Sequence, residues 1–222
     1  MSETLYREPT AAHDASVIWM HGLGASSADF IDMPRIITRP GTRWVFPNAP
    51  VRPVTLNNGW RMPSWFDIRF LDGDEHSEDR ESREEAADSH RIISALIEEE
   101  HEKGIPYSRI VLVGFSQGGA MSLYTGCRFQ HQLAGMVCLS GYVLFHETHL
   151  TDSHAENRNT PVLICHGTND EMVPYRSGFL TAGFMKENGW PISFEDYPMQ
   201  HEVCMEEIRR VGEFLAEVLD QN

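Results

Sequence analysis

Short apolar runs alternate along the chain with segments that repeat apolar residues every three or four positions. The apolar runs are rich in β-branched residues and apolar on both faces, which is typical of central strands in a parallel sheet. They cover residues 16–20, 110–113, 136–139 and 162–165, and a further strand is expected at 193–197. These runs predict a sheet whose two faces are both covered.

The segments between the runs have helical periodicity. The clearest begins at the capping box Ser82-Arg83-Glu84-Glu85 and stops at Gly104-Ile105-Pro106. Further helices are expected at 117–129, 176–188 and 203–219. Strands that alternate with helices favour right-handed βαβ crossovers. The pattern therefore predicts an α/β fold in a single domain, 1–222, with a mostly parallel central sheet and helices on both faces.

The composition of the chain argues against nucleic acid and membranes as partners. The 222 residues include 33 acidic and 18 basic side chains, a formal charge of −15 that argues against nucleic acid. The polar N-terminus resembles no signal peptide, and no apolar window reaches the roughly 18 residues of a membrane span. The four widely spaced cysteines are expected to be reduced thiols. We expect a cytoplasmic protein without stable membrane insertion.

Glycine and polar residues follow three of the predicted strands, as HGLG, GFSQGG and HGTND. Ligands of parallel α/β sheets bind beyond the carboxyl ends of the strands. GFSQG fits the pattern G-x-S-x-G, in which a strained strand-to-helix turn presents a serine. Because a predicted strand precedes Ser116 and a predicted helix follows it, the motif indicates a nucleophile at a helix N-terminus.

A nucleophilic serine needs a histidine base and an acid that orients the histidine. His201 follows the predicted last strand and precedes the last helix, where the order serine, acid, histidine would place the base. His21 and His166 stand before glycines and are expected to hold turns. The other eight histidines are expected to be solvated: His13, His76, His90, His101, His131, His146, His149 and His154.

The acid is predicted to be Asp170, which follows the run at 162–165 directly. Asp196 is its main rival, although it lies within a predicted strand, and Glu202 is too close to His201 to face the ring easily. A turn-capping aspartate without catalytic duty stays an alternative. The oxyanion donors are predicted to be the backbone N–H groups of Gln117 and Leu23, although HGLG alone could be a plain tight turn.

Residues 50–71 combine turn residues with large apolar side chains and have no helical or strand period. This segment predicts a substrate groove or a minimal cap formed by a loop. The alternative is that its rings pack the loop onto the core. The predicted substrate-binding residues are Met62, Trp65, Phe66, Leu71 and Val173.

Several motifs together resemble the small carboxylesterase and acyl-protein thioesterase family of α/β-hydrolases. They are HGLGASSADF, FPNAPVRPVTLNNGWRMPSWFDI, GFSQGGAMSLYTG, LSGY, CHGTNDEMVP and PMQHEVCMEEI, spread from about residue 17 to 215. The resemblance implies an α/β-hydrolase fold and Ser116, Asp170 and His201 as the triad. It also implies Leu23 and Gln117 as oxyanion donors and hydrolysis of esters or thioesters without a cofactor.

The sequence thus predicts a carboxylesterase that acts on a small-molecule ester or acyl-thioester substrate. An acyl-protein thioesterase or lysophospholipase is the alternative within the same class, and a silent binding protein is the alternative from another class. Residues 146–160 are polar and histidine-rich, and a solvated loop is expected there in preference to a metal site. By resemblance, a homodimer could bury the apolar loops.

Overall fold

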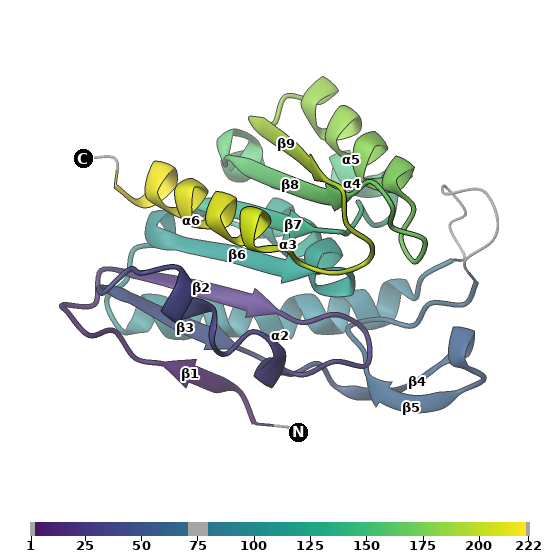
Figure 1. Ribbon diagram of the computed structural model, residues 1–222, viewed down its shortest axis with the longest axis horizontal. Coiled ribbons are helices and arrows are strands. Elements are labelled where there is room, and N and C mark those ends of the chain that lie inside the picture. Colours follow the sequence, from purple (N-terminus) through teal and green to yellow (C-terminus); the bar gives the residue numbers. More distant parts are fainter. Residues whose placement is uncertain (1–2, 71–79, 221–222) are drawn as a thin grey trace.

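The computed structural model describes residues 3–70 and 80–220, and their main feature is a seven-stranded sheet (Figure 1). The strand order is β1-β3-β2-β6-β7-β8-β9, in which only the β1–β3 pair is antiparallel. The strands are β1 (Leu5–Arg7), β2 (Ala15–Met20), β3 (Thr42–Phe46), β6 (Ile110–Phe115), β7 (Gly135–Leu139), β8 (Val162–Gly167) and β9 (Ile192–Tyr197). The mostly parallel sheet predicted from the apolar runs is confirmed.

Helices cover both faces of this sheet, as predicted (Figure 1). One face carries α2 (Arg83–Glu102), α3 (Gln117–Arg128) and α5 (Tyr175–Glu187), and the other carries α1 (Met33–Ile36) and α6 (Met205–Leu219). The side chain of Ser82 caps α2 by accepting a hydrogen bond from the Glu85 N–H. No helix in the described ranges is both long and apolar enough to cross a membrane.

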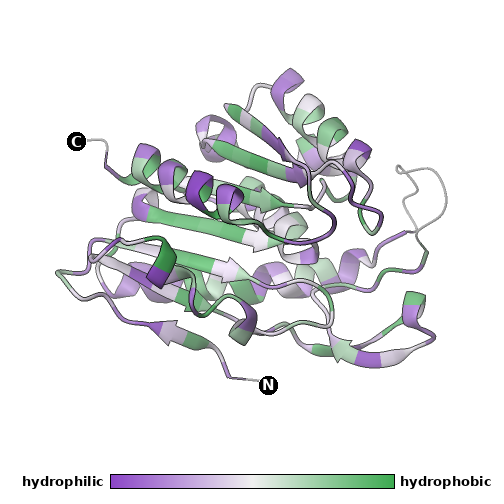
Figure 2. Ribbon diagram, viewed as in Figure 1, coloured by the Kyte–Doolittle hydropathy of each residue, from purple (hydrophilic) through white to green (hydrophobic). Residues whose placement is uncertain are grey.

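The continuous apolar runs arise because the central strands are buried on both faces. In β2, Ile18 packs with the helices of the α2–α3 face, and its neighbour Val17 packs with α6 on the opposite face. Figure 2 shows the same property along β6 and β8, which are hydrophobic over most of their length. Period-2 alternation is therefore absent from these strands.

Residues 50–70 are more regular than the sequence indicates. The structure has an antiparallel hairpin of β4 (Val51–Val54) and β5 (Trp60–Pro63), which projects beyond the carboxyl edge of the sheet (Figure 1). Asn58 and Gly59 turn the chain with φ of 55° and 76°. The expectation of irregular chain was wrong here because two-stranded pairing with an exposed outer face needs no apolar run.

The histidine-rich segment 146–160 also differs from the predicted solvated loop. It contains α4 (His146–Asp152) and a 3-10 helix over Ala155–Asn159. His149 is fully buried, with its ring 5.8 Å from that of Phe184 and 5.7 Å from that of Trp190. The prediction that His149 is solvated was therefore wrong, because α4 places its ring against these aromatic side chains. The prediction was also wrong for His90 on α2, which is half-buried with its ring 6.0 Å from that of Tyr124.

Candidate active site

A strained turn between β6 and α3 presents Ser116. Its φ of 56° and ψ of −119° lie in a region that non-glycine residues rarely adopt. A Cβ on Gly114 would lie 2.0 Å from the Gly118 carbonyl oxygen, and one on Gly118 would lie 2.4 Å from the Met20 carbonyl oxygen. Both glycines of the G-x-S-x-G motif are therefore required by close backbone approach at the carboxyl edge of β6.

The structure brings Ser116, His201 and Asp170 into one hydrogen-bonded chain. His201 Nε2 lies 2.9 Å from Ser116 Oγ, and His201 Nδ1 lies 2.7 Å from Asp170 Oδ2. In neutral imidazole only one ring nitrogen carries a proton. An ionised Asp170 can only accept, so Nδ1–H donates to it and Nε2 is left to accept from the serine hydroxyl.

The Asp170 carboxylate is held in place by backbone as well as by His201. Its Oδ1 accepts hydrogen bonds from the N–H groups of Met172 and Val173, each at 2.9 Å. Burial by itself raises the pKa of this carboxyl, but the hydrogen bonds from His201 and Val173 outweigh burial and lower the pKa below its usual value. Asp170 therefore stays ionised near neutral pH.

The two rivals for the acid lie elsewhere. The Asp196 carboxylate accepts a hydrogen bond of 2.7 Å from the Tyr175 hydroxyl on α5. Glu202 is exposed at the surface of the loop that follows His201. Of the three acids weighed from the sequence, Asp170 is the one in contact with His201 Nδ1.

The two other strand-end histidines hold turns, as the sequence predicts. His21 Nδ1 lies 2.7 Å from the Gly22 carbonyl oxygen, and His21 Nε2 accepts from the Ala49 N–H at 3.0 Å. His166 is fully buried, and its Nε2 lies 2.9 Å from the Val173 carbonyl oxygen. Burial lowers the pKa of both imidazoles, so both rings are neutral.

A cavity of about 410 Å³ opens beside the serine. Ser116, Gln117, Leu23 and His201 line one part of it, so both predicted oxyanion residues border the nucleophile. Its other walls are mostly apolar, including Phe30, Leu56, Met62, Ile68, Phe115 and Val173. Such a volume accommodates a small ligand or an extended acyl chain.

The predicted substrate-binding residues divide into three groups. Met62 and Val173 line the cavity. Trp65 and Phe66 do not line it: both are fully buried in the core beneath α2, which is the packing alternative weighed from the sequence. Leu71 lies outside the described residues.

Two further cavity residues were not predicted to bind substrate, although both lie in motifs that carry the family resemblance: Phe30 ends HGLGASSADF and Tyr142 ends LSGY. Phe30 follows a 3-10 turn near the HGLG segment, and Tyr142 follows the end of β7. Both come from segments without an apolar period, and only the folded chain brings them to the carboxyl edge of the sheet.

The chain is similar to known proteins over almost its whole length. The phospholipase/carboxylesterase family matches residues 4–219. Acyl-protein thioesterase 1 of Cryptococcus neoformans is 38% identical over 95% of each chain, and that of Neurospora crassa is 38% identical over 94% of this chain and 89% of its own.

Solved structures give the same result. SOBER1 of Arabidopsis thaliana has a TM-score of 0.83 and 30% identity, covering 93% of this chain and 99% of its own. Acyl-protein thioesterase 2 of Zea mays has a TM-score of 0.86 and 27% identity, covering 99% of this chain and 100% of its own. The chain belongs to the phospholipase/carboxylesterase family of α/β-hydrolases, and it is a serine hydrolase.

Proposed function

We propose that the chain hydrolyses carboxylic esters through an acyl-enzyme on Ser116, with His201 as general base and Asp170 as the acid that orients it. The observation that carries this proposal is the hydrogen-bonded chain from Asp170 Oδ2 through His201 to Ser116 Oγ at the edge of an apolar cavity. Such a chain lets a neutral histidine take the serine proton and then stabilises the imidazolium.

The reaction has two halves. Ser116 Oγ attacks the substrate carbonyl as its proton moves to His201 Nε2, and the backbone N–H groups of Leu23 and Gln117 stabilise the oxyanion. His201 then protonates the leaving group, and the acyl-enzyme forms. In the second half His201 deprotonates a water that attacks the acyl carbonyl, which releases the acid and restores Ser116. These steps need no cofactor.

A second candidate is hydrolysis of thioesters of long-chain acyl groups on proteins. The observation that favours it is that relatives 38% identical to this chain over almost its whole length are named acyl-protein thioesterase 1. The apolar walls of the cavity suit either an ester or a thioester of an acyl chain, because the triad recognises the carbonyl and the walls recognise the chain.

We also propose a cytoplasmic setting and self-association. Cys127, Cys138 and Cys165 are buried free thiols, which suits a reducing compartment. Trp60 on the β4–β5 hairpin is 75% exposed, and a homodimer could cover it. Light scattering of the wild type and of Trp60→Ser tests this, since an unchanged monomeric mass in both rejects the dimer.

The test of the reaction is hydrolysis of p-nitrophenyl esters and acyl-thiocholines from two to sixteen carbons, with wild type and Ser116→Ala. We expect Ser116→Ala to lose at least about a thousandfold in kcat and to lose labelling by a fluorophosphonate. Retained hydrolysis in Ser116→Ala rejects the mechanism. Activity on short esters supports the carboxylesterase, whereas activity confined to long-chain thioesters supports the second candidate.

A further inference from the structure

The side chain of Gln117 binds the chain that follows the β4–β5 hairpin. Its Oε1 accepts from the Trp65 N–H at 2.8 Å, and its Nε2 donates to the Phe66 carbonyl oxygen at 2.6 Å and to Ser64 Oγ at 3.2 Å. Gln117 is 3% exposed, so these bonds are shielded from water. The carboxamide thus bonds to the backbone of two successive residues, Trp65 and Phe66.

The same segment contacts the turn that carries the other oxyanion donor. The Trp65 indole Nε1–H donates to the His21 carbonyl oxygen at 2.8 Å. The Gly24 N–H donates to the Pro63 carbonyl oxygen at 2.8 Å. Since Leu23 lies between His21 and Gly24, residues 63–66 are bonded on both sides of it and also to Gln117.

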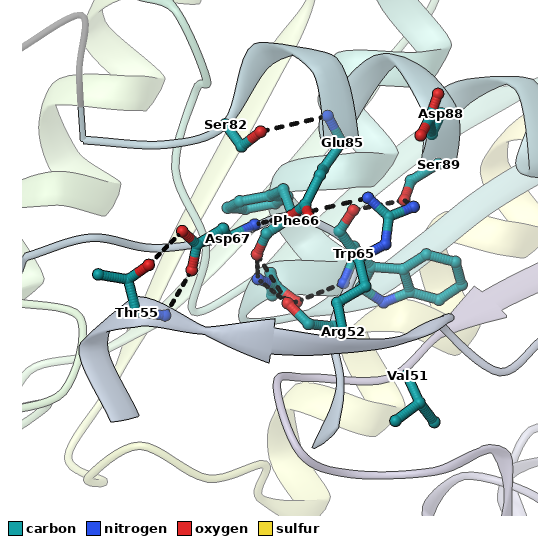
Figure 3. A network of polar contacts seen from close by, with 12 residues as sticks. Val51, Arg52, Thr55, Trp65, Phe66, Asp67, Ser82, Glu85, Asp88 and Ser89 are labelled. Atoms are coloured by element: carbon teal, nitrogen blue, oxygen red, sulfur yellow. Dashed lines mark hydrogen bonds and ion pairs between the residues drawn. The ribbon is translucent and has the colours of Figure 1, made fainter. Parts of the chain in front are cut away.

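The outer side of the segment is fixed to α2 and the hairpin (Figure 3). Ser89 Oγ donates to the Trp65 carbonyl oxygen, and the Asp67 N–H donates to Glu85 Oε2 at 2.6 Å. The Arg52 guanidinium lies 3.7 Å from Glu85 Oε2 and 3.5 Å from Ser89 Oγ. Residues 63–66 are therefore held from α2 as well as from the active-site side.

We propose that residues 63–66 set the spacing between the Leu23 and Gln117 N–H groups, and that the Gln117 carboxamide and the Trp65 indole are positioning residues of the oxyanion hole. This inference rests on the proposed function. Oxyanion donors act only when they lie within hydrogen-bond distance of the oxygen of the tetrahedral intermediate, and they must be held there before the reaction. Neither side chain lies on the reacting atoms.

The inference predicts that substituting these side chains weakens stabilisation of the transition state and leaves substrate binding unchanged. Gln117→Met keeps the size of the side chain but removes the hydrogen bonds of the carboxamide, and Trp65→Phe removes the indole donor. We expect each to lower kcat about 10- to 100-fold with KM within about twofold. Affinity for a trifluoromethyl ketone, which forms a tetrahedral adduct on serine, is expected to fall with kcat/KM, while affinity for the product acid stays unchanged.

Ser122→Ala is the matched control on the same helix. Ser122 is fully buried and its Oγ lies 2.7 and 2.8 Å from the carbonyl oxygens of Gly119 and Val137, which share its single O–H donor and do not belong to residues 63–66. We expect this variant to melt at a lower temperature with kcat unchanged. An equal loss of kcat in Ser122→Ala attributes the effect to general loosening of α3 and overturns the inference.

The remaining outcomes separate this inference from the proposed function. Hydrolysis that depends on Ser116 but is unaffected by Gln117→Met and Trp65→Phe overturns the inference and leaves the mechanism standing. A loss that lies in KM alone also overturns it. If Gln117→Met fails to fold, Trp65→Phe is judged by the same readouts.

Discussion

Ser116 adopts its strained backbone only because the residues two positions away on either side have no side chain. The strain presents Oγ to His201 at 2.9 Å and starts α3 at Gln117, whose N–H points to the same region as the other N-terminal donors of the helix. At this scale the function depends on glycine as much as on serine. Gly119 is less constrained, since an added Cβ would lie 3.0 Å from the Gly114 carbonyl oxygen.

Gly118→Ala is the sharpest test of this turn. The added methyl would lie 2.4 Å from the Met20 carbonyl oxygen and 2.6 Å from that of His21, so β2 and α3 must separate. We expect a loss of about 1–3 kcal/mol in the free energy of unfolding and a loss of most activity.

Gly183→Ala on α5 is the control for Gly118→Ala. A Cβ there meets nothing within 4 Å, so this variant is expected to be as stable as the wild type or slightly more stable. Urea unfolding and ester hydrolysis measure both variants. Equal stability and activity of Gly118→Ala and wild type would contradict the explanation of the motif.

Among the elements, the central strands were predictable and β3 was not. Residues 16–20, 110–113, 136–139 and 162–165 are each a continuous apolar run. In β3 the run is interrupted by Arg43, which is buried nonetheless because its guanidinium bonds to Glu100 on α2. A charged residue that pairs with a partner 57 positions away gives no local signal.

The active site was also predicted only in part from the sequence. The sequence predicted Ser116, His201 and Asp170 because each follows a recognisable strand, and the structure places them in contact. It did not predict the buried positions of Trp65 and Phe66, because an apolar loop looks the same whether its rings face a ligand or the core. Only the bonds to Gln117 and His21 decide between the two.

The buried carboxylate of Glu100 connects α2 to β3 through Arg43 and to β2 through Ser16. Its contribution to the stability of the fold can be tested by substitution. Glu100 is 1% exposed on α2 and also accepts from Ser16 Oγ of β2 at 2.7 Å and from Lys103 Nζ at 2.8 Å. Arg43 keeps a second partner in Glu8, whose Oε1 lies 3.1 Å from its Nε, so Glu100→Gln removes one of the two carboxylates that face the guanidinium. Because the lost hydrogen bonds are to a buried charged group, we expect Glu100→Gln to lower the free energy of unfolding by about 2 kcal/mol at pH 7.

The pKa of Glu100 fixes how this loss depends on pH. Burial raises its pKa, but the hydrogen bonds from Lys103 and Ser16 and the charge of Arg43 outweigh burial and lower it below 4.5. A lowered pKa adds stability above the unfolded value that is lost as the pH falls through the folded one. The difference between Glu100→Gln and wild type in urea should therefore shrink below pH 4.5, and a constant difference would contradict this.

Over the whole molecule, two kinds of group with shifted pKa values change stability in opposite directions as the pH rises. Burial lowers the pKa of His21, His90, His149 and His166 from 6.5, to about 4 for His90 and about 3 for His149. The unfolded chain therefore binds protons at these residues below pH 6.5 that the folded chain does not, so acid destabilises the fold there. Four such histidines make the stability rise steeply up to pH 6.5.

Glu207 on α6 opposes them, and its effect continues above pH 6.5, where that of the histidines has ended. It is fully buried, and burial raises its pKa from 4.5 to about 8, so the folded chain keeps a proton that the unfolded chain releases. Each pH unit between 6.5 and 8 then costs up to about 1.4 kcal/mol of unfolding free energy. We expect wild-type stability in urea to peak near pH 6.5 and to decline towards pH 8, and the Glu207→Gln variant to stay level over that range. An identical decline in the variant would assign it to other groups, whereas a level curve would assign the loss of stability between pH 6.5 and 8 to one buried carboxyl in the last helix of the fold that carries the site.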